Sequence, residues 1–114
     1  MSIVQDRVIQ RFADLEVQCR AIPLINRNEE NLTSYAQPEQ FYAWATSALN
    51  AIQGVFGKES SHSERFELEM KSISNNFVWE RKIETLRGVF LGAKSDVDGG
   101  HLREINGDIL NFRG

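Results

Sequence analysis

The chain has 114 residues, of which 41% are hydrophobic and 25% charged, as in one globular domain rather than a disordered segment. A formal net charge of −3 argues against a surface that binds nucleic-acid phosphates, and the single cysteine, Cys19, excludes an intrachain disulfide. No apolar run reaches the roughly 18 residues of a membrane span and no secretory leader is recognisable, so we expect a cytoplasmic protein that does not enter a membrane.

Most of the chain has apolar residues spaced alternately three and four apart, a spacing that lines one side of an α-helix. The first run predicts a helix that begins after Ser2 and ends near residues 20–22, before Pro23. Its apolar stripe consists of Val8, Phe12, Leu15, Cys19 and Ile22. Residues 26–37 are polar, follow neither period and precede Pro38, so we expect a loop there.

A second helix is expected from Pro38, in its first turn, to Gly57, just past its end. Its stripe consists of Phe41, Ala45, Ala48, Ile52 and Val55, widened on either side by Trp44, Leu49 and Phe56. A capping box of Ser61 and Glu64 opens a shorter third helix. The apolar positions of that helix are Phe66, Met70 and Ile73.

The fourth helix follows a break at residues 74–76, where Asn75 or Asn76 can cap it, and ends at residues 98–100. Its stripe consists of Trp79, Ile83, Leu86, Phe90, Ala93 and Val97. Residues 102–112 allow a helix with an apolar stripe or a hairpin turn at Asn106-Gly107, and we prefer the helix. The stripe would consist of Leu102, Ile105, Ile109 and Phe112.

Short connections between these helices, and the lack of a competing strand pattern, predict an all-α fold. We expect a compact antiparallel bundle of four to five helices whose apolar stripes face one core. Residues 1–114 should form a single helical domain, either complete or a fragment that lacks a C-terminal domain.

Few residues suggest catalysis or metal binding. His62 and His101 have no histidine or cysteine at ligand spacing, so we interpret them as solvated residues at helix ends. Cys19 falls on an apolar stripe, as a small buried hydrophobe does. Asp96 starts an incomplete calcium loop, and both Asp96 and Asp98 lie where the helix dipole disfavours acids. We therefore predict a protein that is not an enzyme and has no metal or cofactor.

Two glycines inside the fourth helix, Gly88 and Gly92, lie four residues apart. Each glycine costs about 1 kcal/mol relative to alanine in a helix interior, so we look for a compensating contact. We expect close packing of another helix against this face, with Gly54 of the second helix complementing the contact. A ligand that approaches the same backbone is the alternative.

Three basic residues of the fourth helix, Arg81, Lys82 and Arg87, are interleaved with acids. A solvated helix face held by charge pairs is the default interpretation. The alternative is a site for an anionic ligand, which would make the protein an oligomeric binder of a small molecule such as a nucleotide signal.

The aromatic residues give the strongest functional indication, because a bundle of this size cannot hide all of them. We expect surplus apolar surface on the second and fourth helices to bind a partner. The candidate partner-binding residues are Tyr42, Trp44, Leu49, Phe56 and Trp79.

Residues 35–100 contain a series of short sequence matches: Phe41-x-x-Trp44, Leu49, Val55-Phe56-Gly57-x-x-Ser60, Phe66, the run from Leu86 to Ala93, Asp96 and Gly99. In these positions the chain resembles a helical N-terminal module of uncharacterised bacterial proteins. The resemblance implies a second helical domain after this module and a loose association with mobile elements and antiviral defence. It implies no catalytic residue.

These observations predict a non-enzymatic interaction module that self-associates or binds a protein partner. A homo-oligomer is the expected state, and bacterial defence or phage counter-defence the expected context. No nucleic acid or membrane is expected among the partners.

Overall fold

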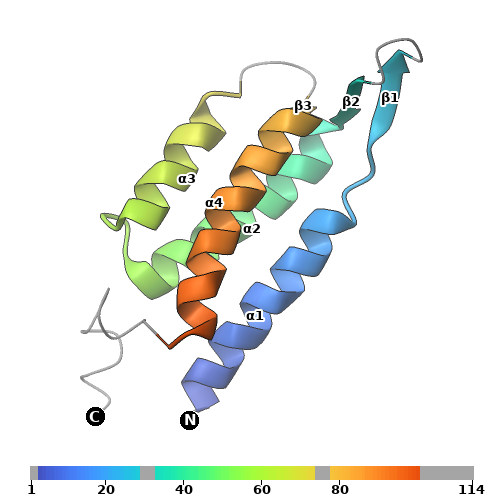
Figure 1. The fold of residues 1–114 in the computed structure, drawn as a ribbon. Coiled ribbons are helices and arrows are strands. Elements are labelled where there is room, and N and C mark those ends of the chain that lie inside the picture. The colour runs from blue at the N-terminus through green and yellow to red at the C-terminus, as the bar shows by residue number, and fades with distance from the viewer. Residues whose placement is uncertain (1–2, 29–32, 74–77, 101–114) are drawn as a thin grey trace.

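The computed structural model describes residues 3–28, 33–73 and 78–100, which form four helices and three short strands (Figure 1). In chain order these are α1 (Ile3–Arg20), β1 (Ile25–Asn28), β2 (Thr33–Ala36), α2 (Pro38–Phe56), α3 (Ser61–Lys71), β3 (Val78–Trp79) and α4 (Glu80–Asp98). The helices run alternately up and down, so the predicted all-α antiparallel bundle is confirmed. The expected fifth helix falls outside the described residues, as do the proposed caps Ser2, Asn75 and Asn76 and the turn at Asn106.

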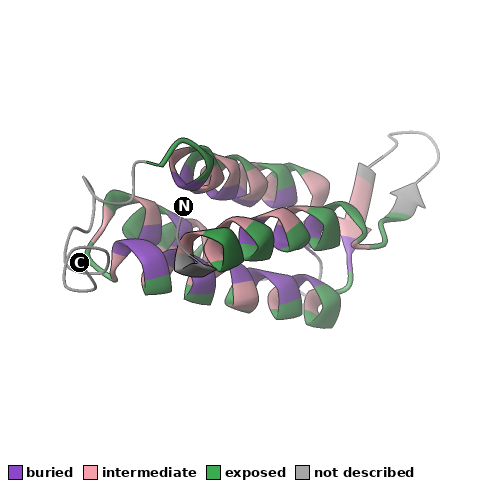
Figure 2. Cartoon of the chain, turned by 90° about the horizontal axis from the view of Figure 1, so that it is seen from below, coloured by how far each residue is buried: buried purple, intermediate pink, exposed green. Residues whose placement is uncertain are grey.

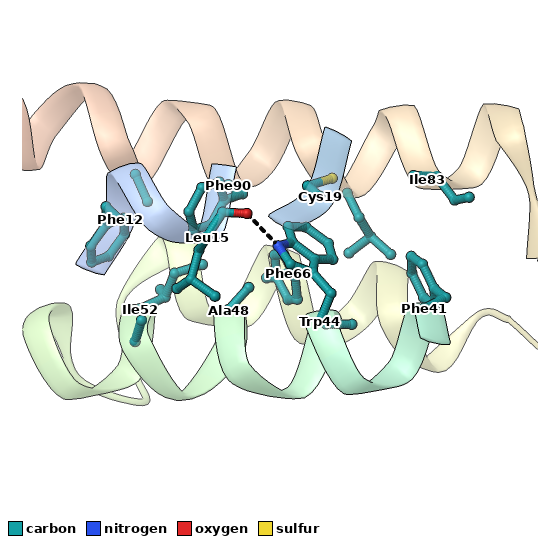
Figure 3. Packing of buried hydrophobic residues seen from close by; sticks show 14 of the residues in the cluster. Phe12, Leu15, Cys19, Phe41, Trp44, Ala48, Ile52, Phe66, Ile83 and Phe90 are labelled. Carbon is teal, nitrogen blue, oxygen red and sulfur yellow. Dashed lines mark hydrogen bonds between the residues drawn. The ribbon is translucent and has the colours of Figure 1, made fainter. Parts of the chain in front are cut away.

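The four helices enclose one core, because α2 and α4 each pack against both α1 and α3. Their buried residues form stripes that face inward, with exposed residues on the outside (Figure 2). Aromatic rings fill the centre: Phe12 stacks on Phe90 at 5.4 Å between ring centroids, and Trp44 lies 5.7 Å from Phe90 (Figure 3). The three-and-four spacing of the sequence therefore identified the side of each helix that the core buries.

The strands correct two expectations. Residues 26–37 do not form a plain loop: β1 pairs antiparallel with β2, and β2 pairs antiparallel with β3. Trp79, expected in the fourth helix, belongs to β3, directly before α4, and its ring meets Tyr35 edge-on at 5.9 Å. The sheet thus joins the α1–α2 connection to the α3–α4 connection. Strands of two to four residues are too short to show an apolar–polar alternation in the sequence. They form because they pair with segments that are distant in the chain.

The ends of the helices follow the sequence signals closely. Pro38 begins α2, and Gly57 ends it with a φ of 91°, a conformation that glycine adopts without strain. The predicted cap of α3 is wrong by one residue: Ser60, not Ser61, is the N-cap, and its Oγ accepts a hydrogen bond from the Ser63 amide at 3.1 Å. The fully buried Ser63 hydroxyl in turn donates to the Gly57 carbonyl oxygen at 2.6 Å.

None of the helices in the described part of the chain combines the length and the apolar content needed to cross a membrane.

Candidate interaction groove

A shallow groove of about 750 Å³ runs along the surface between α3 and α4. The residues of α3 that line it are Ser61, His62, Glu64, Arg65 and Leu68. The residues of α4 that line it are Thr85, Gly88, Val89 and Gly92. We call this feature the α3–α4 groove.

The two glycines that drew attention in the sequence form the floor of the α3–α4 groove. Both are exposed, and a Cβ atom added at Gly88 would meet nothing within 4 Å. At Gly92 it would meet the imidazole Cε1 of His62 at 4.0 Å, an ordinary van der Waals distance. The prediction that another helix of this chain packs closely against them was wrong, and Gly54 has nothing within 4 Å of a Cβ atom either. An approaching ligand or partner stays a prediction.

The main apolar side chain beside the groove is Leu68, which is 66% exposed. The buried side of α3 is set by Phe66, whose side chain is fully buried. At about 100° per residue, Leu68 is rotated roughly 200° from Phe66 around the helix, so it faces solvent. Sequence analysis missed Leu68, although a large apolar residue on the polar side of an amphipathic helix was a usable signal.

One end of the groove is closed by a side-chain hydrogen bond between the helices. His62 Nε2 lies 2.7 Å from the Asp96 Oδ2 atom, and the imidazole ring packs 4.9 Å from the Phe56 ring. The interpretation of His62 as a solvated residue was therefore wrong, because the side chain is only 22% exposed. In two consecutive antiparallel helices, the start of the first lies beside the end of the second. The contact between His62 and Asp96 could have been predicted from the sequence on that basis.

The opposite end of the α3–α4 interface is held by Lys82. Its Nζ atom donates to Glu69 Oε1 at 3.1 Å and to Ser72 Oγ at 2.8 Å. Cross-helix contacts therefore hold α3 against α4 at both ends of the groove, with the two glycines between them.

The three basic residues proposed for an anionic ligand are not brought together. Lys82 is bound to α3, while Arg81 is exposed on the outer face of α4. Arg87 acts on α1, where its charge lowers the pKa of Cys19, an effect outweighed by burial, which raises it. The prediction of one anionic site from these residues was wrong, because their positions on α4 differ by 100° or more around the helix.

The candidate partner-binding residues fall into three groups. Trp44 and Phe56 are buried, and the Trp44 indole donates a 2.8 Å hydrogen bond to the Leu15 carbonyl oxygen (Figure 3). Their assignment to a partner-binding surface was wrong. Trp79 is half-buried in β3.

Tyr42 and Leu49 are half-buried and line a second, smaller groove between α2 and α3, of about 300 Å³. The other residues of this groove are Glu67, Met70, Lys71 and Ile73. Of the five candidates, these two are the ones that the structure places beside each other at a groove.

Within residues 3–28, 33–73 and 78–100, no group of three His, Cys, Asp or Glu side chains is arranged to hold a metal ion. Cys19 is buried and unbridged, and this burial raises the pKa of its thiol. His101 lies outside the described residues.

Comparison with protein-family models, with curated proteins and with solved structures finds no match to this chain. The resemblance to a bacterial helical module therefore stays a prediction.

Proposed function

We propose that this protein is a non-enzymatic interaction module that binds an α-helix of a protein partner in the α3–α4 groove. The observation that carries the proposal is the floor of the groove, two exposed glycines inside a regular helix. Docking an amphipathic helix in a groove between helices is a common mode of recognition.

The glycines support this function because nothing in the described residues compensates for their cost. Each destabilises α4 by about 1 kcal/mol relative to alanine. Neither makes a contact that a methyl group would prevent. Without a Cβ atom, however, the backbone of α4 allows another helix to approach closely. A partner helix would gain van der Waals contact there that a side chain at Gly88 would block.

Leu68 supplies the apolar contact beside this floor. Full burial of a leucine side chain contributes about 1.5–3 kcal/mol, and two thirds of this residue is still exposed. A helix lying on Gly88 and Gly92 would cover Leu68, since all three line the same groove. The groove thus combines a close-approach surface with an apolar anchor.

The test compares two substitutions of equally exposed residues. Leu68 is 66% exposed on α3 and Val17 is 67% exposed on α1. An aspartate at either position changes the charge and removes an apolar group at little cost to the fold. We expect the untagged wild-type protein, purified from the cells that make it, to carry a protein partner or a second copy in native mass spectrometry. Val17→Asp should keep that assembly and Leu68→Asp should lose it.

Two results would contradict the proposal. The first is an assembly that survives in both variants or is lost in both. The second is a wild-type protein that has the mass of one bare chain under every condition. Circular dichroism of both variants serves as the check that each is folded.

The alternative hypothesis, a binder of small anions, is no longer supported, because the structure does not bring together the three basic residues on which it was based. A role in defence and a cytoplasmic location remain predictions that accompany the interaction module.

A further inference from the structure

We infer that the segment following α4, residues 101–114, covers the α3–α4 groove in the free chain, and that a partner helix has to displace it. This regulation rests on the proposed function and concerns the same site. Three features of the chain carry it: the place where α4 ends, the apolar pattern of the segment and the exposed apolar side chains of the groove.

The last turn of α4 brings the chain to one end of the groove. Asp96, in that turn, is hydrogen-bonded to His62 in the first turn of α3. Gly100 has a φ of 77°, a left-handed conformation that ends a helix and turns the chain away from its axis. The segment that begins at residue 101 therefore starts close to His62 and needs no long connection to enter the groove.

The segment has the sequence pattern of a short amphipathic helix. Leu102, Ile105, Ile109 and Phe112 follow the same three-and-four spacing as the buried stripes of the bundle. An isolated helix of fewer than about 12–15 residues is marginal in water, so this pattern predicts a helix only where an apolar surface supports the stripe. The α3–α4 groove is the apolar surface at which the segment begins.

The apolar side chains of the groove lie at the distance that the stripe reaches. Leu68 is six residues beyond His62 along α3, about 9 Å, and Val89 is seven residues before Asp96 along α4, about 10 Å. Ile109 is seven residues after the start of the stripe, also about 10 Å in a helix. A helix that starts beside His62 and follows the groove therefore places Ile109 over Leu68 and Val89. Leu68 is 66% exposed and Val89 is half-buried, so both have apolar surface left to bury.

The covalent connection strengthens this contact. A short flexible linker gives an effective concentration in the millimolar range, so a contact that would be weak between separate chains is populated within one chain.

The segment and a partner helix compete for the same groove. The large side chains of Ile105, Ile109 and Phe112 keep the segment at an ordinary side-chain distance from the backbone of α4. A partner helix with small residues at the crossing comes closer to Gly88 and Gly92, and this closer contact allows it to displace the segment. The apparent affinity for the partner is lowered by the fraction of chains whose groove is open.

The first experiment measures amide hydrogen exchange of residues 101–114 by mass spectrometry in dilute wild type, Leu68→Asp and Val17→Asp. Val17 is as exposed as Leu68 and does not line the groove. In wild type and Val17→Asp, peptides covering residues 105–112 should exchange at least about tenfold more slowly than in Leu68→Asp, because a docked helix protects its amides. Free exchange in wild type, or equal protection in Leu68→Asp and Val17→Asp, would overturn the covering of the groove. Protection that appears only at high protein concentration would also overturn it, because the segment would then bind to a second copy.

The second experiment tests the competition, with a labelled peptide of residues 101–114 as the probe and two full-length variants as the receptors. Ile109→Asp places a charge in the apolar stripe, while Leu110→Asp changes the neighbouring residue, about 100° away around a helix. The peptide should bind Ile109→Asp about tenfold or more tightly than Leu110→Asp, because only Ile109→Asp has an open groove. Adding Leu68→Asp to Ile109→Asp should remove this binding. Equal binding by Ile109→Asp and Leu110→Asp would overturn the competition.

The covering of the groove and the proposed function fail in different ways. If residues 101–114 exchange freely and the assembly that wild type carries is lost only in Leu68→Asp, the groove binds a partner and the segment does not cover it. If the segment is protected in Val17→Asp and unprotected in Leu68→Asp, while both variants carry the same assembly, the segment covers the groove and the proposed function fails.

Discussion

His62 Nε2 and Asp96 Oδ2 lie 2.7 Å apart and join the first turn of α3 to the last turn of α4. The imidazole ring also packs on Phe56, the last residue of α2, so three helices meet at this point. Because Lys82 holds the other end of α3, the spacing of the groove walls is set at both ends. The groove is therefore preformed in the single chain.

The first prediction concerns the energy of the pair formed by His62 and Asp96. A double-mutant cycle with His62→Ala and Asp96→Ala should give a coupling energy of about 0.5–1 kcal/mol for this hydrogen bond. The side chains are 22% and 30% exposed, so water screens them only in part. Urea denaturation of the four proteins measures the coupling. The more exposed pair of Arg20 and Glu16 is the comparison and should couple less strongly. Equal coupling in the two cycles would contradict the prediction.

The second prediction separates three glycines by their conformation. Gly54→Ala and Gly88→Ala should each raise the free energy of unfolding by about 0.5–1 kcal/mol, because both are helical and have room for a methyl group. Gly57→Ala should lower it by about 1 kcal/mol, since a φ of 91° strains any residue with a Cβ atom. The measurement is urea denaturation at a protein concentration low enough to keep the chains apart.

A destabilised Gly88→Ala variant would mean that this glycine already makes a close contact within its own chain. In that case the glycine floor would be explained by internal packing, and it would no longer point to a partner.

The helices were predictable because their signals are long and repeated. Five or more apolar residues at helical spacing identify a buried face, and Pro38 and Gly57 bound α2 at the residues where the structure begins and ends it. The strands were not predictable. β3 has two residues, and what makes it a strand is the pairing of Val78 with Ala36, more than 40 positions earlier in the chain. A local pattern cannot contain that information.

The groove was predictable only in part. The cost of Gly88 and Gly92 in a helix was visible in the sequence, but their exposure was not, because it depends on where α1 and α3 lie around α4. The surplus of aromatic residues was misleading. The bundle buries Trp44, and its indole N–H donates a hydrogen bond to a helix carbonyl oxygen. Because that bond satisfies the polar group, a side chain as large as tryptophan can lie in the core.

The third prediction tests that hydrogen bond. Trp44→Phe removes the 2.8 Å bond to Leu15 and leaves a small cavity, so it should lower the free energy of unfolding by about 1–3 kcal/mol. Tyr42→Phe is the control, since it also removes one donor to a backbone carbonyl, but that bond is 3.4 Å long and only part-buried. Its effect should be less than about 0.5 kcal/mol. Chemical denaturation followed by far-UV circular dichroism compares the variants. An equal loss in both would show that the Trp44 bond adds nothing.

The last prediction concerns the thiol of Cys19. Burial raises its pKa above the ordinary value for cysteine, and the charges of Arg87 and Arg20 oppose this only in part. A disulfide reagent that attacks the thiolate should therefore react with the native protein at pH 8 at least about 100-fold more slowly than with the urea-unfolded chain.

The raised pKa of this thiol also makes the free energy of unfolding depend on pH. Because the folded pKa is the higher one, the unfolded chain ionises first as the pH rises, and protons are then lost on unfolding. The stabilising contribution is fully present below the pKa of the unfolded thiol and decreases as the pH rises through the folded value. Cys19→Ala lacks this titration. The difference in unfolding free energy between wild type and Cys19→Ala should therefore be constant from pH 6 to about 8 and then shift against wild type at higher pH. A difference that stays constant through pH 10 would show that the thiol has the same pKa in both states.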